Sequence, residues 1–274
     1  MSVLRIIIPA HNESHAIREF VESLTTGTQA LDVIVVCNGC TDETAAEARK
    51  AAGDARVLEI ETPSKSVAMQ AADDLVDGFP RFYLDADIAV TPEQLGVLAV
   101  ALDGGLLAVA PSVTYDVSRS SFIVRSYYRA LSLLPAQMSG ISGTGCMGLS
   151  REGRARFATW PAVIADDYFL DGQFAPAEKA RVADVTVLVR APRGVNDLMT
   201  RKLRTLRGNQ QVDQGELRRY PVERGSGLAG IVRAHPSRLL DVVVFVIVSS
   251  VCRIRLRRSD SSSLAWARDR SREL

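Results

Sequence analysis

The chain has 274 residues, of which 47% are hydrophobic and 24% charged, so it can bury a substantial core and is not intrinsically disordered. Its 19 glycines and 11 prolines exclude a collagen-like or low-complexity chain. The formal charge of +1 conceals an asymmetry, because residues 1–189 contain 15 Lys and Arg against 24 Asp and Glu, whereas residues 190–274 contain 18 against 8. A basic C-terminal third suits phosphate groups or acidic lipid headgroups. Nucleic acid is not expected as a partner, since interleaved aromatic residues are missing.

The cysteine content and the N-terminal segment bear on location. Four cysteines in a chain of this length do not form the disulfide framework of a small secreted protein. The residues after Met1 lead directly into a strand-like run, so no leader peptide is expected. These observations predict a cytoplasmic protein, in the cytosol or peripheral on the cytoplasmic face of a membrane.

The first 110 residues alternate apolar runs with helical patterns. Strands are predicted at residues 3–8, 32–37, 56–60, 81–84 and 106–110. Helices are predicted at residues 13–24, 42–52, 64–76 and 92–102. Continuously apolar strands separated by helices of this length indicate an α/β fold, in which a mostly parallel twisted sheet carries helices on both faces.

Beyond residue 120 the pattern is less regular. A helix is predicted at residues 122–134, a small-residue loop at 139–148, a strand at 184–190 and an arginine-rich helix at 196–210. As a helix, the apolar stretch 239–252 would span roughly 21 Å of the roughly 30 Å hydrocarbon core of a bilayer, so it is a poor transmembrane segment. It is predicted to be either a core helix or an interfacial helix whose following arginines contact lipid headgroups. The predicted organisation is a domain at 1–210 and a basic helical extension at 211–274, in which 239–258 is the candidate for membrane contact.

Polar motifs stand where predicted strands end, and ligands of such sheets bind beyond the carboxyl ends of the strands. In chain order the motifs are Pro9-Ala10-His11-Asn12-Glu13, Asn38-Gly39-Cys40-Thr41-Asp42, Lys65 at the start of a helix, and Asp85-Ala86-Asp87. Two carboxylates at a strand exit are hard oxygen ligands, and together with the oxygens of a diphosphate they suit Mg²⁺ or Mn²⁺.

In order and spacing these motifs resemble those of the family 2 glycosyltransferases, inverting hexosyltransferase-type enzymes with the GT-A nucleotide-sugar-binding fold. The resemblance covers roughly residues 3–210. It implies a Mn²⁺ or Mg²⁺ cofactor at Asp87 and Asp85, with Asp87 the more direct ligand and Asp85 nearer the ribose. It also implies that the nucleotide-diphosphate-sugar donor is bound by Pro9, Ala10, Asn12, Glu13, Asn38, Lys65, Asp85, Ala86 and Asp87.

Two later segments extend the resemblance. The small-residue segment 143–148 resembles the strand that lines the acceptor side, which implies acceptor-side positions at Gly145 and Cys146. Asp166 and Asp167 resemble the acidic pair that supplies the catalytic base, and Asp167 is the first choice. The acceptor is expected to be either a lipid-linked sugar or a small molecule.

The chain departs from the family pattern at two places. Cys37 and Asn38 stand where two acidic residues usually precede the glycine, which leaves the identity of the nucleotide base open. The arginine-rich segment 201–209 stands where many relatives carry a Gln-X-X-Arg-Trp motif, so binding of a processive polysaccharide is not implied. Arg204 and Arg207 lie three residues apart on one helical face and could hold diphosphate oxygens.

Other functions fit less well. A nucleotidyltransferase shares the fold but usually opens with a glycine- and arginine-rich phosphate loop, which residues 9–13 do not form. A catalytically silent nucleotide-sugar-binding protein would be expected to lack the carboxylate pair or the base, and both are present. The spacing Cys37-X-X-Cys40 suits a redox site, but Cys37 ends an apolar strand instead of standing exposed at a helix start.

Overall fold

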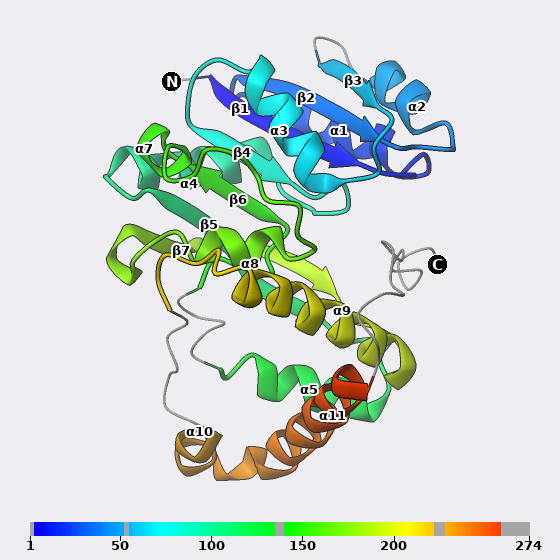
Figure 1. The fold of residues 1–274 in the computed structure, drawn as a ribbon, viewed down its shortest axis with the longest axis vertical. Helices are drawn as coiled ribbons and strands as arrows, with labels where there is room; N and C mark the ends of the chain where they lie inside the picture. Colours follow the sequence, from blue (N-terminus) through cyan, green and yellow to red (C-terminus); the bar gives the residue numbers. More distant parts are fainter. Residues whose placement is uncertain (1–2, 52–54, 135–139, 222–227, 259–274) are drawn as a thin grey trace. The chain divides into compact units, whose positions relative to one another are not determined.

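The computed structural model describes residues 3–51, 55–134, 140–221 and 228–258 (Figure 1). One sheet has seven strands in the order β3-β2-β1-β4-β6-β5-β7. The strands are β1 (Leu4–Ala10), β2 (Leu31–Asn38), β3 (Arg56–Ile60), β4 (Arg81–Leu84), β5 (Ala108–Asp116), β6 (Cys146–Leu149) and β7 (Lys179–Arg190). Parallel pairing joins β1 to β2, β1 to β4 and β2 to β3, whereas β6 runs antiparallel to both β4 and β5. The predicted α/β class with a mostly parallel sheet is confirmed.

Helices lie where the sequence predicts them, near residues 13–24, 42–52, 64–76, 92–102, 122–134, 196–210 and 239–252. The short helices at residues 151–154, 166–171 and 228–234 are not predicted by the apolar patterns. The helices are α1 (Ile17–Thr25), α2 (Thr44–Ala51), α3 (Lys65–Leu75), α4 (Pro92–Asp103), α5 (Phe122–Leu131), α7 (Arg151–Arg154), α8 (Asp166–Asp171), α9 (Val195–Gln214), α10 (Leu228–Ala234) and α11 (Leu239–Arg258). Short 3₁₀ turns lie at Pro176–Glu178 and Pro236–Arg238. In α1 the predicted apolar face is buried, and it consists of Ile17, Phe20, Val21 and Leu24.

The central strand β1 is covered on both faces. Ile6, Ile7 and Ile8 each have 0% exposure, although successive side chains of a strand point to opposite sides. A run without alternation is the pattern expected of a parallel strand between two helical layers.

One strand lies in a segment that the residue composition predicts to be a loop and that the family resemblance indicates to be a strand. Strand β6 occupies the end of the predicted small-residue loop at 139–148 and pairs with β4. The pairing requires a residue without a side chain at Gly148, since a Cβ there would lie 2.4 Å from a ring carbon of Phe82. Composition alone predicts a loop here because close packing against an aromatic ring selects glycine, and glycine is otherwise a sign of a loop. The strand within 143–148 is indicated by the family resemblance instead.

A buried carboxylate ties α3 to β4. Asp73 Oδ1 accepts hydrogen bonds from Arg81 Nη1 and from the Tyr83 hydroxyl, both at 2.7 Å. Its Oδ2 accepts from Arg154 Nε at 2.7 Å and from Trp160 Nε1 at 2.8 Å. Four donors compensate the desolvation of this carboxylate, whose side chain is 2% exposed. The network therefore fixes the two elements whose far ends carry the third and fourth predicted motifs.

The chain divides into two compact units. The first comprises Met1–Val113, Ile141–Ala162 and Gln173–Val187, and the second comprises Thr114–Gly140, Val163–Gly172 and Leu188–Leu274. The predicted domain boundary at residue 210 stays a prediction.

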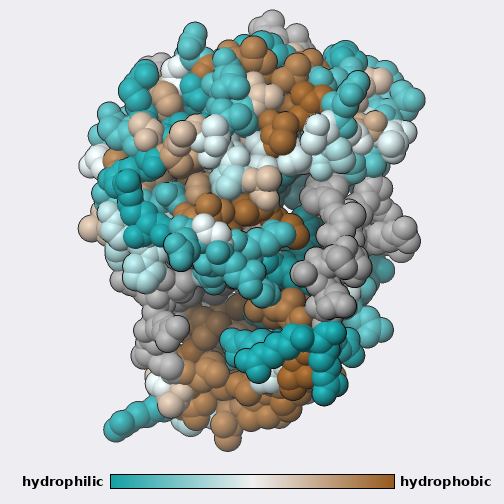
Figure 2. Space-filling view, viewed as in Figure 1, coloured by the Kyte–Doolittle hydropathy of each residue, from teal (hydrophilic) through white to brown (hydrophobic). Residues whose placement is uncertain are grey.

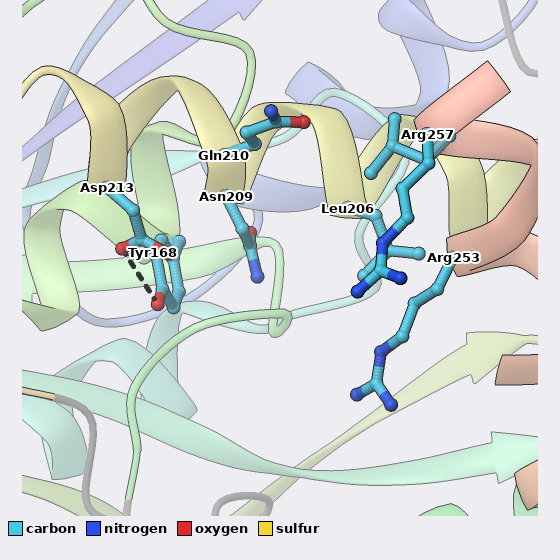
Figure 3. A pocket seen from close by; sticks show the side chains of 8 residues that line it. Tyr168, Leu206, Asn209, Gln210, Asp213, Arg253 and Arg257 are labelled. Atoms are coloured by element: carbon cyan, nitrogen blue, oxygen red, sulfur yellow. Dashed lines mark hydrogen bonds between the residues drawn. The ribbon is translucent and has the colours of Figure 1, made fainter. Parts of the chain in front are cut away.

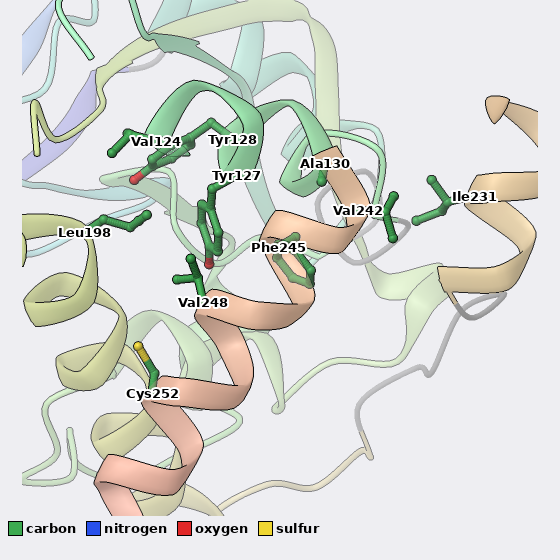
Figure 4. Close-up of a cluster of buried hydrophobic side chains, with 10 residues drawn as sticks. All are labelled: Val124, Tyr127, Tyr128, Ala130, Leu198, Ile231, Val242, Phe245, Val248 and Cys252. Carbon is green, nitrogen blue, oxygen red and sulfur yellow. The ribbon is translucent and has the colours of Figure 1, made fainter. Parts of the chain in front are cut away.

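The second unit has its own apolar core, formed mainly by α5, α9 and α11 (Figure 4). Tyr127 of α5 stacks on Phe245 of α11 with 5.1 Å between ring centroids. Lys202 of α9 places its Nζ 5.7 Å from the centre of the Phe245 ring, and burial lowers the pKa of this lysine. Of the helices that the structure describes, none combines the length and the apolar character needed to cross a bilayer.

Candidate active site

The loops that follow β1 and β2 are joined by hydrogen bonds. Asn12 Oδ1 accepts from the Thr41 backbone N–H at 2.7 Å, and His11 Nδ1 donates to the Asn38 carbonyl at 2.6 Å. Asn38 Nδ2 in turn donates to the carbonyl of Ala10 at 2.9 Å. Asn12 itself has a φ of 55°, a left-handed conformation that asparagine tolerates better than most residues. The first two predicted motifs thus form one cluster at the carboxyl ends of their strands.

Asn38 is an internal part of this cluster. The residue is 1% exposed, and its Oδ1 has no hydrogen-bond partner among the residues that the structure describes. A buried acceptor of this kind costs about 1–3 kcal/mol. In this structure Asn38 supports the β1 loop on which Asn12 stands.

The third motif is brought close to the second by a glycine. Gly39 has a φ of 56°, and a Cβ at this position would lie 2.7 Å from Pro63 Cβ and 2.9 Å from Pro63 Cα. The Gly39 N–H donates to the Ile60 carbonyl at 2.8 Å. Two residues after Pro63, Lys65 begins α3, and Ser64 caps this helix by accepting from the Val67 N–H. Close contact between the two loops therefore depends on the missing side chain at Gly39.

The third and fourth motifs meet in an ion pair. Lys65 Nζ lies 2.7 Å from Asp85 Oδ1, although twenty residues separate them in the chain. The Asp85 N–H donates to the Gly145 carbonyl at 2.8 Å, and a Cβ at Gly145 would lie 3.3 Å from Asp85 Oδ2. Within this motif Ala86 is buried and Asp87 is exposed. Gly145, predicted for the acceptor side, is therefore a neighbour of the Asp85 carboxylate.

Cys146 lies deeper than its neighbour. Its exposure is 0%, and burial, with a smaller contribution from the charge of Asp85, raises the pKa of its thiol well above the ordinary value. The buried thiol of Cys146 is therefore not expected to contact an acceptor. Cys146 could contribute to the acceptor side only through its backbone and through the packing of the strand.

The chemistry of the donor set fits a divalent cation. Within residues 3–51, 55–134, 140–221 and 228–258, no group of three or more His, Cys, Asp or Glu side chains forms a metal site. Asp85 and Asp87 nevertheless provide two hard oxygen donors directly after β4. Mg²⁺ and Mn²⁺ commonly bind to one or two carboxylates together with phosphate oxygens, so this pair suits an ion that shares its ligands with a diphosphate.

Two thiols stand beside the cluster formed by the first two motifs. Cys40 Sγ accepts from the Asn12 N–H at 3.4 Å and contacts the Ala10 carbonyl at 3.6 Å. A hydrogen bond from the Cys37 thiol lowers the pKa of Cys40 below the ordinary thiol value, and the Asn12 N–H acts in the same direction. Cys37 is buried and Cys40 is half-buried.

The predicted catalytic pair lies in the second unit, at the start of α8. Asp166 is 6% exposed, whereas Asp167 is half-buried and therefore more accessible. Asp167 Oδ1 accepts from the Tyr168 N–H at 2.7 Å. Of the two carboxylates, Asp167 is the one that a substrate can reach more easily.

The position of α8 depends on residues that sequence reasoning missed. A Cβ at Gly208 of α9 would lie 2.7 Å from the Cβ of Ala165, the residue before the acidic pair. Arg218 Nη1 donates to the Tyr168 carbonyl at 2.7 Å, and Arg218 Nη2 lies 3.3 Å from Asp171 Oδ2. The signal for Gly208 is a glycine in the interior of a helix, which costs about 1 kcal/mol relative to alanine and therefore often marks close packing.

A cavity of about 580 Å³ lies beside α8 in the second unit (Figure 3). Its lining residues are Tyr168, Leu206, Asn209, Gln210, Asp213, Arg253, Leu256 and Arg257. The Tyr168 hydroxyl donates to Asp213 Oδ1 at 3.2 Å. The predicted diphosphate residues, Arg204 and Arg207, lie on α9, which also supplies cavity residues. Arg204 is exposed and Arg207 is half-buried, but neither lines the cavity. Arg253 and Arg257 give the cavity a cationic side.

Comparison with known proteins identifies the family. A mannosyltransferase from Pyrobaculum calidifontis, solved with GDP-Man and Mn²⁺, has a TM-score of 0.60 and 18% identity over 94% of this chain and 76% of its own. Glucosyl-3-phosphoglycerate synthase from Mycobacterium tuberculosis, solved with Mn²⁺, UDP and phosphoglyceric acid, has a TM-score of 0.55 and 20% identity over 82% and 81% of the two chains. These likenesses show the GT-A fold, and no curated protein matches the chain. The sequence model of glycosyl transferase family 2 matches residues 5–151, more than half of the chain. With a sheet of this topology and this match, the chain belongs to glycosyl transferase family 2 and is a glycosyltransferase.

Proposed function

We propose that the protein is an inverting, metal-dependent glycosyltransferase that moves a sugar from a nucleotide-diphosphate donor to an acceptor hydroxyl. The observation that supports this best is the ion pair between Lys65 and Asp85, at 2.7 Å. It joins two motifs that lie twenty residues apart in the chain, at the edge of the sheet where such folds bind ligands.

The donor's nucleotide is assigned to the loops after β1 and β2. Backbone groups of Pro9 and Ala10 and the side chains of Asn12 and Glu13 would contact it. Support comes from the hydrogen bond between Asn12 and Thr41, which holds the two loops together. Asn38 would act by holding this loop, since its amide already donates to the Ala10 carbonyl.

Negative charge builds on the diphosphate as the bond to the anomeric carbon breaks, so stabilisation must be directed at the leaving oxygens. Asp85 and Asp87 would hold Mn²⁺ or Mg²⁺, which supplies neutralising charge to the diphosphate when bound. Lys65 would orient the Asp85 carboxylate through its ion pair. Arg204 and Arg207 of α9 would add cationic groups for the phosphate oxygens.

Inversion requires a base that takes the proton of the acceptor hydroxyl on the face opposite the leaving group. Asp167 is assigned this role because it is the more exposed member of the acidic pair. Asp166, at 6% exposure, would keep the start of α8 in place. The packing of Gly208 on Ala165 supports a fixed position for this segment.

Two measurements test the function. Purified protein is incubated with UDP-, GDP- and dTDP-sugars, with and without Mn²⁺, and slow hydrolysis of the donor is followed because it needs no knowledge of the acceptor. Nucleotide-sugars of one base should be hydrolysed, and release of the nucleoside diphosphate should depend on the metal. The released sugar should have the inverted anomeric configuration.

The base is tested with Asp167→Asn, and Asp197→Asn, an exposed aspartate of α9, is the matched control. Asp167→Asn should lower turnover by about 10²–10⁴-fold while nucleotide binding, measured by thermal shift, stays within about twofold. Wild-type turnover in Asp167→Asn would show that Asp167 is not the base. Hydrolysis that does not depend on the metal would show that Asp85 and Asp87 do not act as metal ligands in the reaction.

A further inference from the structure

Helix α11 is apolar on two opposite sides, and only one of them is covered. The covered side contains Val242, Phe245, Val248 and Cys252, which pack against α5 and α9 (Figure 4). The covered side agrees with the core-helix interpretation of residues 239–252.

The other side of α11 is an exposed, mostly apolar stripe. Its large apolar residues have exposures between 39% and 58%, and they are Leu239, Leu240, Val243, Val246, Ile247 and Ile254. At 3.6 residues per turn these positions fall along one side of the helix. Figure 2 shows apolar surface gathered over the part of the second unit that contains α11 and α5 in Figure 1.

The charges around this stripe have one sign. Between residues 228 and 258 the exposed charged side chains are Arg233, Arg238, Arg253, Arg255, Arg257 and Arg258. The acidic residue of this range, Asp241, is 6% exposed and lies 3.4 Å from Arg238 and 3.9 Å from Arg129. Arginines therefore lie before the first turn of α11 and in its last two turns, and residues 228–258 contain no exposed acidic residue.

From this arrangement we infer that α11 lies on the surface of an anionic lipid bilayer, with its apolar stripe among the acyl chains and its arginines on acidic headgroups. A helix of 20 residues extends about 30 Å, so lying in the interface would bring the whole stripe into contact with lipid. Since no described helix can cross a bilayer, this contact is peripheral.

A second copy of this chain is a poorer occupant of the stripe. Arginines flank the stripe at both ends, so a twofold pairing of α11 with itself would set positive ends against positive ends in either orientation. Such like-charge contact opposes association, whereas anionic headgroups complement it.

The test is flotation of the full chain with vesicles of phosphatidylcholine alone and of an equal mixture of phosphatidylcholine and phosphatidylglycerol. The protein should float with the anionic vesicles and bind the neutral ones more weakly. Added salt should weaken binding without abolishing it, because headgroup contacts are screened and apolar contacts are not. The inference does not rest on the proposed function, because neither donor nor acceptor is present in the assay.

Two sets of variants separate the apolar and the charged contributions. Val243→Ser, Val246→Ser and Ile247→Ser together should lower the affinity for anionic vesicles by about tenfold or more. The matched control replaces exposed apolar residues of the first unit, Leu75→Ser, Val97→Ser and Val100→Ser, and should leave binding unchanged. Arg255→Gln and Arg258→Gln should each lower affinity for anionic vesicles roughly fivefold and leave the weak binding to neutral vesicles unchanged.

Several outcomes would overturn the inference. One is that the protein binds neither kind of vesicle. Another is that the triple serine variant of the stripe binds anionic vesicles as well as the wild type does. A third is that sedimentation velocity shows a dimer of the wild type that the triple serine variant does not form. Circular dichroism checks that each variant is folded, and the single substitution Ile247→Ser gives the same comparison if the triple variant does not fold.

Discussion

Lys65 Nζ lies 2.7 Å from Asp85 Oδ1, and this contact joins the start of α3 to the residue that follows β4. Both side chains remain partly exposed, at 28% and 38%, so the pair contributes no more than about 1 kcal/mol to folding. A pair that adds little to stability while holding a predicted ligand carboxylate is expected to matter for donor binding.

Lys65→Met should therefore raise the KM for donor hydrolysis by about tenfold, while Tm changes by less than about 3 °C. The control is Lys50→Met on α2, which removes a lysine from another exposed pair, with Glu47. Steady-state hydrolysis and thermal unfolding are measured on both. A large loss of Tm without a change in KM would show that Lys65 serves folding instead.

Gly208→Ala should impair catalysis through the position of the acidic pair. The new Cβ would lie 2.7 Å from the Ala165 Cβ and 2.9 Å from its backbone N, so the segment that begins α8 has to move. Overpacking of this kind costs about 1–3 kcal/mol and outweighs the gain of about 1 kcal/mol from alanine in a helix.

The matched control is Gly194→Ala, directly before the same helix, where the nearest atom would be Asp197 Oδ2 at an ordinary 3.5 Å. We expect Gly208→Ala to lower kcat at least tenfold with the donor KM unchanged, and Gly194→Ala to lower neither. Unaltered kcat in Gly208→Ala would mean that the start of α8 does not need its present position.

Asp73→Ala should be among the most destabilising substitutions in the first unit. It leaves Arg81 and Arg154, whose side chains are 10% and 11% exposed, without their carboxylate partner. Breaking a buried ionic group in this way costs about 3–5 kcal/mol. Urea unfolding should show this loss, whereas Asp74→Ala, at an exposed neighbouring position on α3, should change stability by about 0.5 kcal/mol or less.

The thiol of Cys40 should react at lower pH than an ordinary cysteine. Its pKa is lowered mainly by the hydrogen bond from Cys37, so between this pKa and the ordinary thiol pKa of about 8.5 Cys40 is a thiolate while other thiols are protonated. Alkylation with iodoacetamide, followed by mass spectrometry across pH, should give a midpoint for Cys40 below that of free cysteine.

Cys37→Ala should move this midpoint to higher pH, because the donor that stabilises the thiolate is removed. Cys146 provides an internal control, since it is fully buried and burial raises the pKa of its thiol. An identical midpoint with and without Cys37 would contradict the hydrogen bond as the cause.

Much of the first unit can be predicted from sequence because its signals are local. An unbroken run such as Ile6-Ile7-Ile8, followed by Pro9, is typical of a strand that is covered on both faces. The spacing of the apolar residues in α1 places them on one face of a helix. The local pattern predicts a loop where β6 lies, and only the family resemblance indicates a strand there. The reason is that Gly148 is selected by packing against the Phe82 ring, a contact between residues far apart in the chain.

The sequence by itself determined the α/β order, the place of each polar motif at the end of a strand, and the family to which those motifs point. Tertiary structure decided that Lys65 contacts Asp85, that Asn38 is buried, and that Asp167 is more accessible than Asp166. It also decided that α11 has one covered and one exposed apolar face. The physical reason is that periodicity records which side of an element is apolar, whereas burial and ion pairing depend on neighbours that only the folded chain supplies.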